Sequence, residues 1–276
     1  MKNRIGVIAG GGQFPLLFAQ AAQEAGREVV AIAHLGETDP ELEKNVDQLY
    51  WVKLGQLGKI LSIFRKEGIR ETVLVGTITK TRMFRDVLPD LKGLALWNKI
   101  DIRQDDAILR AVADALEDEG IKVLESTIYL KQLFFPQGIL TKQKPSPEQY
   151  EDIRFGMKIA RSIGALDIGQ SVVVRDKTVL AVEAIEGTDA AIRRGGSLGK
   201  ENAVVIKVKK PNQDFRFDLP AIGTTTLESM MEVKAKVLAV EAGQALLFDR
   251  QAFIDEANRA GIIVVGVEDR DGEPEI

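Results

Sequence analysis

The chain has 276 residues, 45% of them hydrophobic and 28% charged, which is the composition of a globular protein of about two domains. It contains no cysteine and a single histidine, His34. This excludes disulfides, thiolate nucleophiles and every metal centre that needs cysteine or two histidines. The 37 basic and 41 acidic residues give a net charge of −4, so no general affinity for nucleic acid is expected. Carboxylates, hydroxyls, lysine, arginine and a hard metal ion remain as the expected chemistry.

The first residues lead directly into a strand-like segment, without the basic region, apolar region and cleavage site of a signal peptide. No apolar run approaches the roughly 20 residues that a membrane-spanning helix needs. We therefore expect a cytoplasmic protein. Peripheral contact with the cytoplasmic face of the inner membrane remains open.

The first half of the sequence alternates short β-branched runs with helical patterns, which predicts a parallel sheet. Gly26, Gly68 and Gly120 stand after the three expected helices as stop signals. We predict an α/β domain with a parallel sheet over residues 1–133. Its expected strands are 5–9, 29–35, 49–54, 72–77 and 122–125, and its expected helices are 14–25, 57–67 and 105–119.

The amino-acid composition changes over residues 134–148, where prolines and lysines predict a linker. The second half predicts a mixed α+β domain over residues 149–276. Strands 170–174 and 179–183 would form a hairpin around Arg175-Asp176-Lys177-Thr178. The other expected elements are helices 148–163, 226–235 and 251–260 and strands 203–209, 237–241, 245–248 and 262–267.

A glycine loop, Gly10-Gly11-Gly12, follows the first expected strand. Such a loop lets backbone amides approach a phosphate at the N-terminus of a helix. Pro15 stands where the dinucleotide-binding fingerprint has its third glycine, and the second strand ends in Ala33-His34-Leu35 without an acid for a ribose. NAD binding is therefore disfavoured, while a phosphate cradle and a simple tight turn both remain open. His34 is expected to have no catalytic role, since no partner for it is identifiable.

Three clusters in the second half break the apolar pattern. Residues 183–189 contain three acids around Thr188, and we consider both a helix N-cap at Thr188 and an anion or metal-bridged site. Lys207 and Lys209 would share one face of a strand, which favours an edge strand kept soluble by lysine. Asp218 lies between apolar residues, so it is either paired with Arg216 or Arg193 or held for chemistry.

Four motifs, in this order, resemble the LpxI family, the UDP-2,3-diacylglucosamine pyrophosphatases of lipid A biosynthesis. The likeness spans essentially the whole chain. The motifs are Ile8-Ala9-Gly10-Gly11-Gly12-x-x-Pro15, Leu166-Asp167-Ile168-Gly169-Gln170, Ala181-Val182-Glu183-Ala184-x-Glu186-Gly187-Thr188-Asp189 and Asp218-Leu219-Pro220-x-Ile222-Gly223.

This resemblance implies Mg²⁺-dependent hydrolysis of the substrate's pyrophosphate bond, with Mn²⁺ as an alternative, to UMP and 2,3-diacylglucosamine 1-phosphate (lipid X). It also implies a Rossmann-like N-terminal domain, a distinct C-terminal domain, a substrate held between the two, and a homodimer. Asp218 would be the catalytic acid. Because hard cations prefer carboxylate oxygens, Asp218 with Glu183 or Asp189 would hold the metal or orient the water. The substrate contacts that the resemblance implies are Gly11, Gly12, Thr77, Ile78, Ser126, Leu140, Gln170 and Thr188.

Two other functions remain open on the sequence alone. A nucleotide-sugar-dependent oxidoreductase would require nicotinamide binding, against which the incomplete fingerprint counts. A non-catalytic nucleotide-binding regulator would bind such a ligand without turnover.

Overall fold

The computed structural model describes residues 3–78, 90–97, 107–211, 213–216, 219–270 and 273–276. The chain divides into two compact units, Met1–Lys131 with Asp214–Asp218 and Gln132–Gln213 with Leu219–Ile276. Each unit has its own sheet and its own hydrophobic core. Within the proposed linker, Gly138–Ile139 form a short strand, β6, of the second unit's sheet, and the domain bounds themselves stay predictions.

Unit 1 contains a five-stranded parallel sheet, as the alternating pattern predicts. The strand order is β3-β2-β1-β4-β5, so the chain moves outward from β1 to β3 and then crosses to the other side of β1. The carboxyl ends of β1 and β4 therefore form the switch point where ligands of such sheets bind. The strands are β1 (Arg4–Ala9), β2 (Glu28–His34), β3 (Gln48–Val52), β4 (Glu71–Val75) and β5 (Lys122–Val123).

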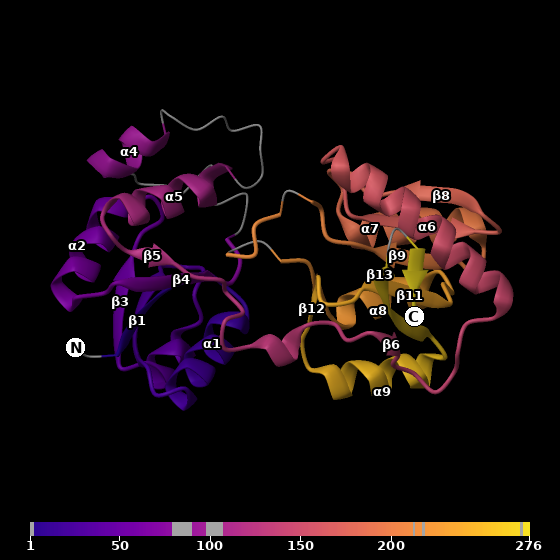
Figure 1. The fold of residues 1–276 in the computed structure, drawn as a ribbon, viewed down its shortest axis with the longest axis horizontal. Helices are drawn as coiled ribbons and strands as arrows, with labels where there is room; N and C mark the ends of the chain where they lie inside the picture. Colours follow the sequence, from indigo (N-terminus) through magenta and orange to yellow (C-terminus); the bar gives the residue numbers. More distant parts are fainter. Residues whose placement is uncertain (1–2, 79–89, 98–106, 212, 217–218, 271–272) are drawn as a thin grey trace. The chain divides into compact units, whose positions relative to one another are not determined.

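Helices cover both faces of this sheet (Figure 1). The helices are α1 (Phe14–Glu24), α2 (Leu57–Glu67), α4 (Leu91–Trp97) and α5 (Ala107–Asp118), and α4 has no counterpart among the sequence predictions. α2 and α5 pack on the face that carries Ile8 and Ile32, while α1 contacts β1, β2 and β4. Consecutive residues of β1 and β2 are buried, apart from the first of each strand. Since side chains of a strand alternate between the two faces of a sheet, both faces are covered here.

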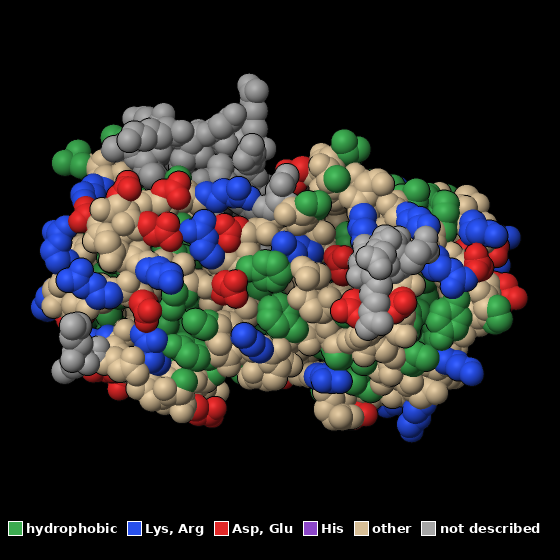
Figure 2. Space-filling model, in the orientation of Figure 1, with side chains coloured by type: hydrophobic (Ala, Val, Ile, Leu, Met, Phe, Trp, Pro, Cys, Tyr) green, Lys and Arg blue, Asp and Glu red, His purple; other side chains and the backbone are tan. Residues whose placement is uncertain are grey.

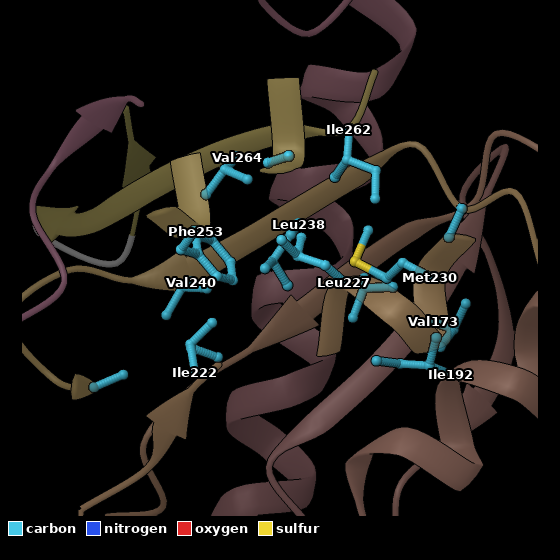
Figure 3. Close-up of a cluster of buried hydrophobic side chains, with 14 of the residues drawn as sticks. Val173, Ile192, Ile222, Leu227, Met230, Leu238, Val240, Phe253, Ile262 and Val264 are labelled. Carbon is cyan, nitrogen blue, oxygen red and sulfur yellow. The ribbon is translucent and has the colours of Figure 1, made fainter. Parts of the chain in front are cut away.

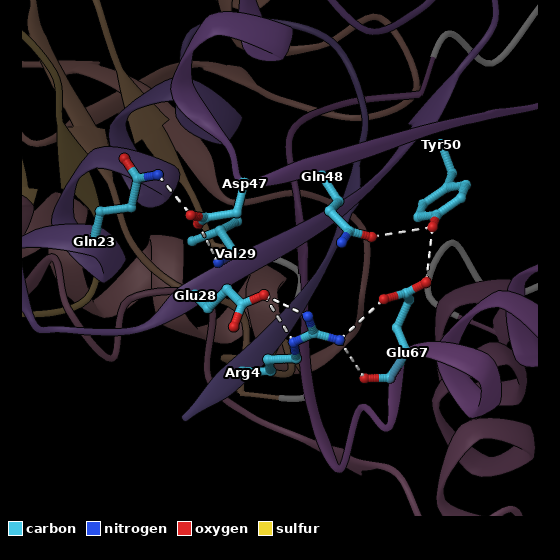
Figure 4. Close-up of polar contacts among 8 residues, drawn as sticks. All are labelled: Arg4, Gln23, Glu28, Val29, Asp47, Gln48, Tyr50 and Glu67. Atoms are coloured by element: carbon cyan, nitrogen blue, oxygen red, sulfur yellow. Dashed lines mark hydrogen bonds and ion pairs between the residues drawn. The ribbon is translucent and has the colours of Figure 1, made fainter. Parts of the chain in front are cut away.

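Ion pairs and hydrogen bonds connect the elements at the amino-terminal end of the unit 1 sheet (Figure 4). Arg4 at the start of β1 donates to Glu28 on β2 and, at 3.0 Å, to the carboxylate and the carbonyl oxygen of Glu67 at the end of α2. The Tyr50 hydroxyl donates to the other Glu67 oxygen at 2.8 Å. These contacts stabilise the amino-terminal end of the sheet. The candidate site lies at the opposite end, where the strands have their carboxyl ends.

Unit 2 is built on a seven-stranded mixed sheet with the order β14-β13-β11-β9-β7-β8, in which β6 also pairs with β13. Its strands are β7 (Ser171–Arg175), β8 (Thr178–Val182), β9 (Val204–Lys207), β11 (Val237–Glu241), β13 (Ile263–Arg270) and β14 (Glu273–Glu275). β7 and β8 form the predicted hairpin. A separate parallel pair joins β10 (Ala221–Ile222) to β12 (Leu246–Leu247), so β12 pairs with β10 rather than with β11.

The central strands of the unit 2 sheet, β7, β9 and β11, are buried on both faces. α6 (Pro147–Ala165) covers one face through Ile153, Met157 and Ala160. α7 (Thr188–Gly199), α8 (Thr224–Glu232) and α9 (Arg250–Ala260) cover the other face, where Leu227, Met230 and Phe253 pack against Leu238, Val240 and Val264 (Figure 3).

The edge-strand interpretation of Lys207 and Lys209 is wrong. β9 pairs with β11 on one side and with β7 on the other, so it lies inside the sheet. Lys207 is its last residue and is buried, and Lys209 lies beyond the strand. A lysine that ends a central strand is enclosed by its neighbours instead of shielding an edge.

On the face drawn in Figure 2, basic and acidic side chains are interspersed. Ion pairs join several charged side chains of unit 1; Arg65 and Lys92, for example, both pair with Glu119. Among the helices of the described residues, none combines the length and the apolar character that crossing a membrane requires.

Candidate functional site

The switch point of unit 1 is formed by two loops that touch through their backbones. The Gly10 amide donates to the Val75 carbonyl at 2.8 Å, and Gly11 and Thr77 exchange two hydrogen bonds of 2.7 and 3.0 Å. A Cβ added at Gly10 would lie 2.4 Å from the Thr77 carbonyl oxygen. Gly10 is therefore required for close packing of the two loops, which accounts for part of the glycine loop without a ligand.

Gly12 has a different role. Its φ is +84°, and a Cβ added there would meet nothing within 4 Å. Gly12 and Thr77 are exposed, Gly11 is buried and Ile78 is half-buried. Because Gly12 stands two residues before α1, an anion can approach the backbone here near the positive end of the helix dipole. Within the loop, Gly12 is thus the glycine with open space beside its backbone.

His34 lies beside this loop and is 7% exposed. Its Nδ1 donates to the Ala9 carbonyl at 2.9 Å, and the Thr38 hydroxyl donates to the same oxygen at 2.7 Å. Burial lowers the pKa of His34, while the Ala9 hydrogen bond and the Glu37 carboxylate oppose that effect. The imidazole is therefore neutral at neutral pH and fixes the end of β1.

The lowered pKa of His34 predicts a pH-dependent stability. As the pH falls, the unfolded chain binds the proton before the folded one, so protonation favours unfolding. We expect the His34 contribution to be complete above about pH 6.5 and to fall below it, by at most about 1.4 kcal/mol per pH unit. Melting temperatures measured between about pH 7.5 and 5.5 should show this slope in the wild type and lose it in His34→Gln. Identical slopes in both proteins would contradict the prediction.

Ser126 binds the segment that precedes Asp218 in the sequence, which is itself part of unit 1. Its hydroxyl and its amide donate to the Phe215 carbonyl at 3.3 and 3.4 Å, and Ser126 is only 2% exposed. Arg216 donates to Asp214 at 2.8 Å and to Glu117 at 3.2 Å. The segment 214–216 is therefore held by side chains of unit 1.

Asp218 itself lies outside the described residues, as do residues 79–89 after Ile78. Of the two arginines suggested as partners of Asp218, Arg216 binds Asp214 and Glu117, and Arg193 binds Glu232.

In unit 2, predicted site residues meet at the end of β8 and the start of α7. The Thr188 hydroxyl donates to Glu183 Oε1 at 3.0 Å and lies 3.4 Å from the Ser171 hydroxyl. Of the two alternatives considered for Thr188, the helix N-cap is wrong: the N-cap is Gly187, with a φ of +83°, and Thr188 is the first helical residue. Its hydroxyl is thus directed to the carboxylate rather than to the helix amides.

Glu183 is 7% exposed, and its second oxygen, Oε2, is buried without a hydrogen-bond partner among the described residues. A buried carboxylate oxygen in this state is costly unless a ligand completes it. The half-buried Asp189 stands at the start of α7. No group of three or more acids or histidines able to hold a metal occurs within the described ranges. Mg²⁺ needs only one or two carboxylates besides water and phosphate oxygens, so Glu183 fits a hard cation.

Lys207 is the functional candidate that the sequence interpretation missed. Its Nζ donates to the Ala221 carbonyl at 3.0 Å. Burial lowers the pKa of Lys207, and the carboxylates of Glu183 and Asp189 raise it. The signal was present, since the uniformly apolar run 203–206 is typical of a strand buried on both faces, where a following lysine is enclosed.

The two remaining predicted contacts also belong to unit 2. Gln170 immediately precedes β7, and its Oε1 is buried without a hydrogen-bond partner in the part of the chain that the structure describes. Leu140 packs against the core that Figure 3 shows, and its amide donates to the Val264 carbonyl at 2.9 Å. Leu140 is thus positioned by the sheet, whereas Gln170 presents an unsatisfied acceptor.

Both halves of the chain match models of known protein domains. The model of the LpxI N-terminal domain matches residues 4–133, and that of the LpxI C-terminal domain matches residues 136–265. The UDP-2,3-diacylglucosamine pyrophosphatase LpxI of Caulobacter vibrioides is 35% identical over 279 aligned positions, covering 96% of this chain and 98% of that protein.

Similar solved structures include the biotin carboxylase subunit of pyruvate carboxylase, with 13% identity and a TM-score of 0.26 over 66% of this chain and 36% of that chain. They also include gox2253, with 10% identity and a TM-score of 0.31 over 89% of this chain and 78% of that chain. These likenesses are too slight to support an argument. The two domain models and the 35% identity show that the chain belongs to the LpxI family.

Proposed function

We propose that this protein hydrolyses the pyrophosphate bond of UDP-2,3-diacylglucosamine to UMP and 2,3-diacylglucosamine 1-phosphate in lipid A biosynthesis. The observation that carries the proposal is the 35% identity, over nearly all of both chains, to a protein named for the pyrophosphatase activity. The oxidoreductase and the non-catalytic regulator have no comparable support.

The chemistry available in each unit is compatible with this reaction. Pyrophosphate cleavage needs groups that bind phosphoryl oxygens, groups that stabilise developing negative charge and a positioned water. In unit 1, the open backbone at Gly12 and the Thr77 hydroxyl offer donors for phosphate or sugar oxygens. In unit 2, Thr188 and Glu183 form a hydrogen-bonded pair. We assign Asp218 to the activation or orientation of the water, and the remaining predicted contacts to substrate binding.

A divalent cation, Mg²⁺ or Mn²⁺, is part of the proposal. Support comes from the buried Glu183 Oε2, an oxygen that a hard cation would satisfy. Asp189 and Asp218 are the further carboxylates that would share the ion. When bound, the metal would neutralise charge on the phosphoryl oxygens. Thr188 would meanwhile orient Glu183 through its hydrogen bond.

We also propose a cytoplasmic homodimer in peripheral contact with the membrane that contains the lipid substrate. The diacyl substrate named for the relative motivates the membrane contact. So do Leu166, Ile168 and Ile185, apolar side chains that are 71%, 47% and 97% exposed on the loops that flank Gly169 and Glu183. Sedimentation equilibrium and co-sedimentation with lipid vesicles test the two statements, and a monomer or a protein that stays in the supernatant would contradict them.

Phosphorus NMR of the purified protein with UDP-2,3-diacylglucosamine tests the function. With Mg²⁺ we expect the pyrophosphate resonances to be replaced by those of UMP and a sugar 1-phosphate. EDTA should stop the reaction and excess Mg²⁺ should restore it, because phosphoryl charge would otherwise stay uncompensated. If neither Mg²⁺ nor Mn²⁺ supports release of UMP, the proposed function is wrong. Full activity in EDTA would overturn the metal proposal alone.

A further inference from the structure

Lys207 is a buried cation at the end of a central strand. It is 6% exposed, and the sheet register sets it opposite Ser171 on β7. An ammonium group is retained in such a place only when polar groups compensate the loss of water. Here the Ala221 carbonyl accepts from Nζ at 3.0 Å, and the negative charges of Glu183 and Asp189 favour the cation.

The carbonyl that Lys207 binds belongs to a short element. Ala221 opens β10, which has only two residues and pairs with β12 alone among the described strands. The preceding Pro220 carbonyl accepts from the Leu246 amide at 2.8 Å. A two-residue strand has few hydrogen bonds of its own. The hydrogen bond from the buried Lys207 is therefore one of the few contacts that hold Ala221 in place.

This anchor stands next to the Asp-Leu-Pro motif in the sequence. Ala221 follows Asp218 by three residues, and Phe215 precedes it by three. Phe215 is held in unit 1 through its carbonyl by Ser126, and Ala221 is held in unit 2 through its carbonyl by Lys207. The motif is therefore flanked on each side by a backbone oxygen that a buried side chain binds.

We propose that Lys207 is a positioning residue for the hydrolysis: its ammonium holds the Ala221 carbonyl and so fixes the first residue of β10, which follows Asp218 by three residues in the sequence. The proposal rests on the proposed function. Lys207 acts through the backbone and not by contact with the substrate, so its loss should slow the chemical step and leave substrate binding nearly unchanged.

The test compares Lys207→Met with a matched control, Lys236→Met. Lys236 also donates to a backbone carbonyl in unit 2, that of Gly261, which lies far from the motif in the sequence. We expect Lys207→Met to lower kcat by about 10²-fold with KM within about threefold of the wild type, the loss typical of a misplaced reacting group. Lys207→Arg, which keeps a charged donor, should recover part of the rate, and Lys236→Met should retain the wild-type kcat.

Hydrogen exchange provides a second readout that does not depend on activity. Backbone amides of Ala221, Ile222 and Gly223 should exchange faster in folded Lys207→Met than in the wild type and in Lys236→Met. Should Lys207→Met fail to fold, Lys207→Gln carries the same test, because a shorter neutral side chain holds the carbonyl less firmly.

The outcomes separate this inference from the proposed function. A wild type that releases no UMP contradicts the function, whatever the exchange data show. With an active wild type, unchanged kcat and unchanged exchange in the folded Lys207 variant overturn the positioning role. A rise in KM at constant kcat also overturns it, since that would mean direct substrate binding.

Discussion

Replacing Asp218 by asparagine is expected to lower kcat for hydrolysis of UDP-2,3-diacylglucosamine by about 10²- to 10³-fold, the scale of removing one group that acts on developing charge in a transition state. Asparagine keeps the size of the side chain and one acceptor oxygen but cannot accept a proton or carry the negative charge that a cation needs. KM should change much less. Steady-state release of UMP, with circular dichroism as the folding check, measures both quantities.

Asp214→Asn is the matched control for Asp218→Asn. Asp214 lies four residues earlier, and its carboxylate accepts from the Arg216 guanidinium at 2.8 Å. The substitution removes one partly exposed ion pair, which is worth about 1 kcal/mol or less, and should leave kcat close to the wild type. A folded Asp218→Asn protein with wild-type kcat would remove Asp218 from the mechanism. Equal losses in both variants would mean that the segment, not the carboxylate, is sensitive.

The sheet of unit 1 could be predicted because its signals are local. Each β-branched run is followed by a helical pattern and a glycine, and this order specifies parallel strands without knowledge of distant contacts. Strand ends were less predictable: the expected 49–54 is Gln48–Val52 in the structure. α4 has no counterpart among the predicted elements, since the seven residues Leu91–Trp97 are too few for a clear helical period.

The role of Lys207 could not be assigned from alternation alone. Whether a strand is central or at an edge depends on pairing with β7 and β11, which lie about 30 residues away on either side in the sequence. Thr188 is a similar case, because Gly187 at a φ of +83° takes the N-cap position and turns the threonine hydroxyl toward Glu183. Local rules singled out these residues but did not predict their contacts.

The glycine loop shows why a motif and its ligand are not equivalent. Gly10 is required by the carbonyl of Thr77, a residue 67 positions later, so the first glycine of the loop serves packing between strand ends. Among the three glycines of the loop, Gly12 alone combines a positive φ with open space. The sequence predicts the need for glycine at both positions, whereas the physical reason for each depends on what folds against it.

Gly169 is the second position where we expect a large effect. A Cβ added there would lie 2.1 Å from the carbonyl oxygen of Glu183 and 2.8 Å from its carbonyl carbon. These are backbone atoms at the end of β8, and the Glu183 amide is itself bound to the Ser171 carbonyl at 2.9 Å. Neither side can yield without moving Glu183 relative to Thr188. Gly169→Ala should therefore destabilise the protein by about 3 kcal/mol or more and lower kcat.

Gly164→Ala is the control for Gly169→Ala, because it adds the same methyl group five residues earlier. Its Cβ would meet no atom closer than 3.6 Å, and Gly164 lies inside α6. Alanine is favoured over glycine in a helix by up to about 1 kcal/mol, so this variant should be neutral or more stable. Urea unfolding midpoints and kcat of the two variants measure the contrast. If Gly169→Ala matches the wild type in both, the loop before β7 does not position Glu183 through this backbone contact.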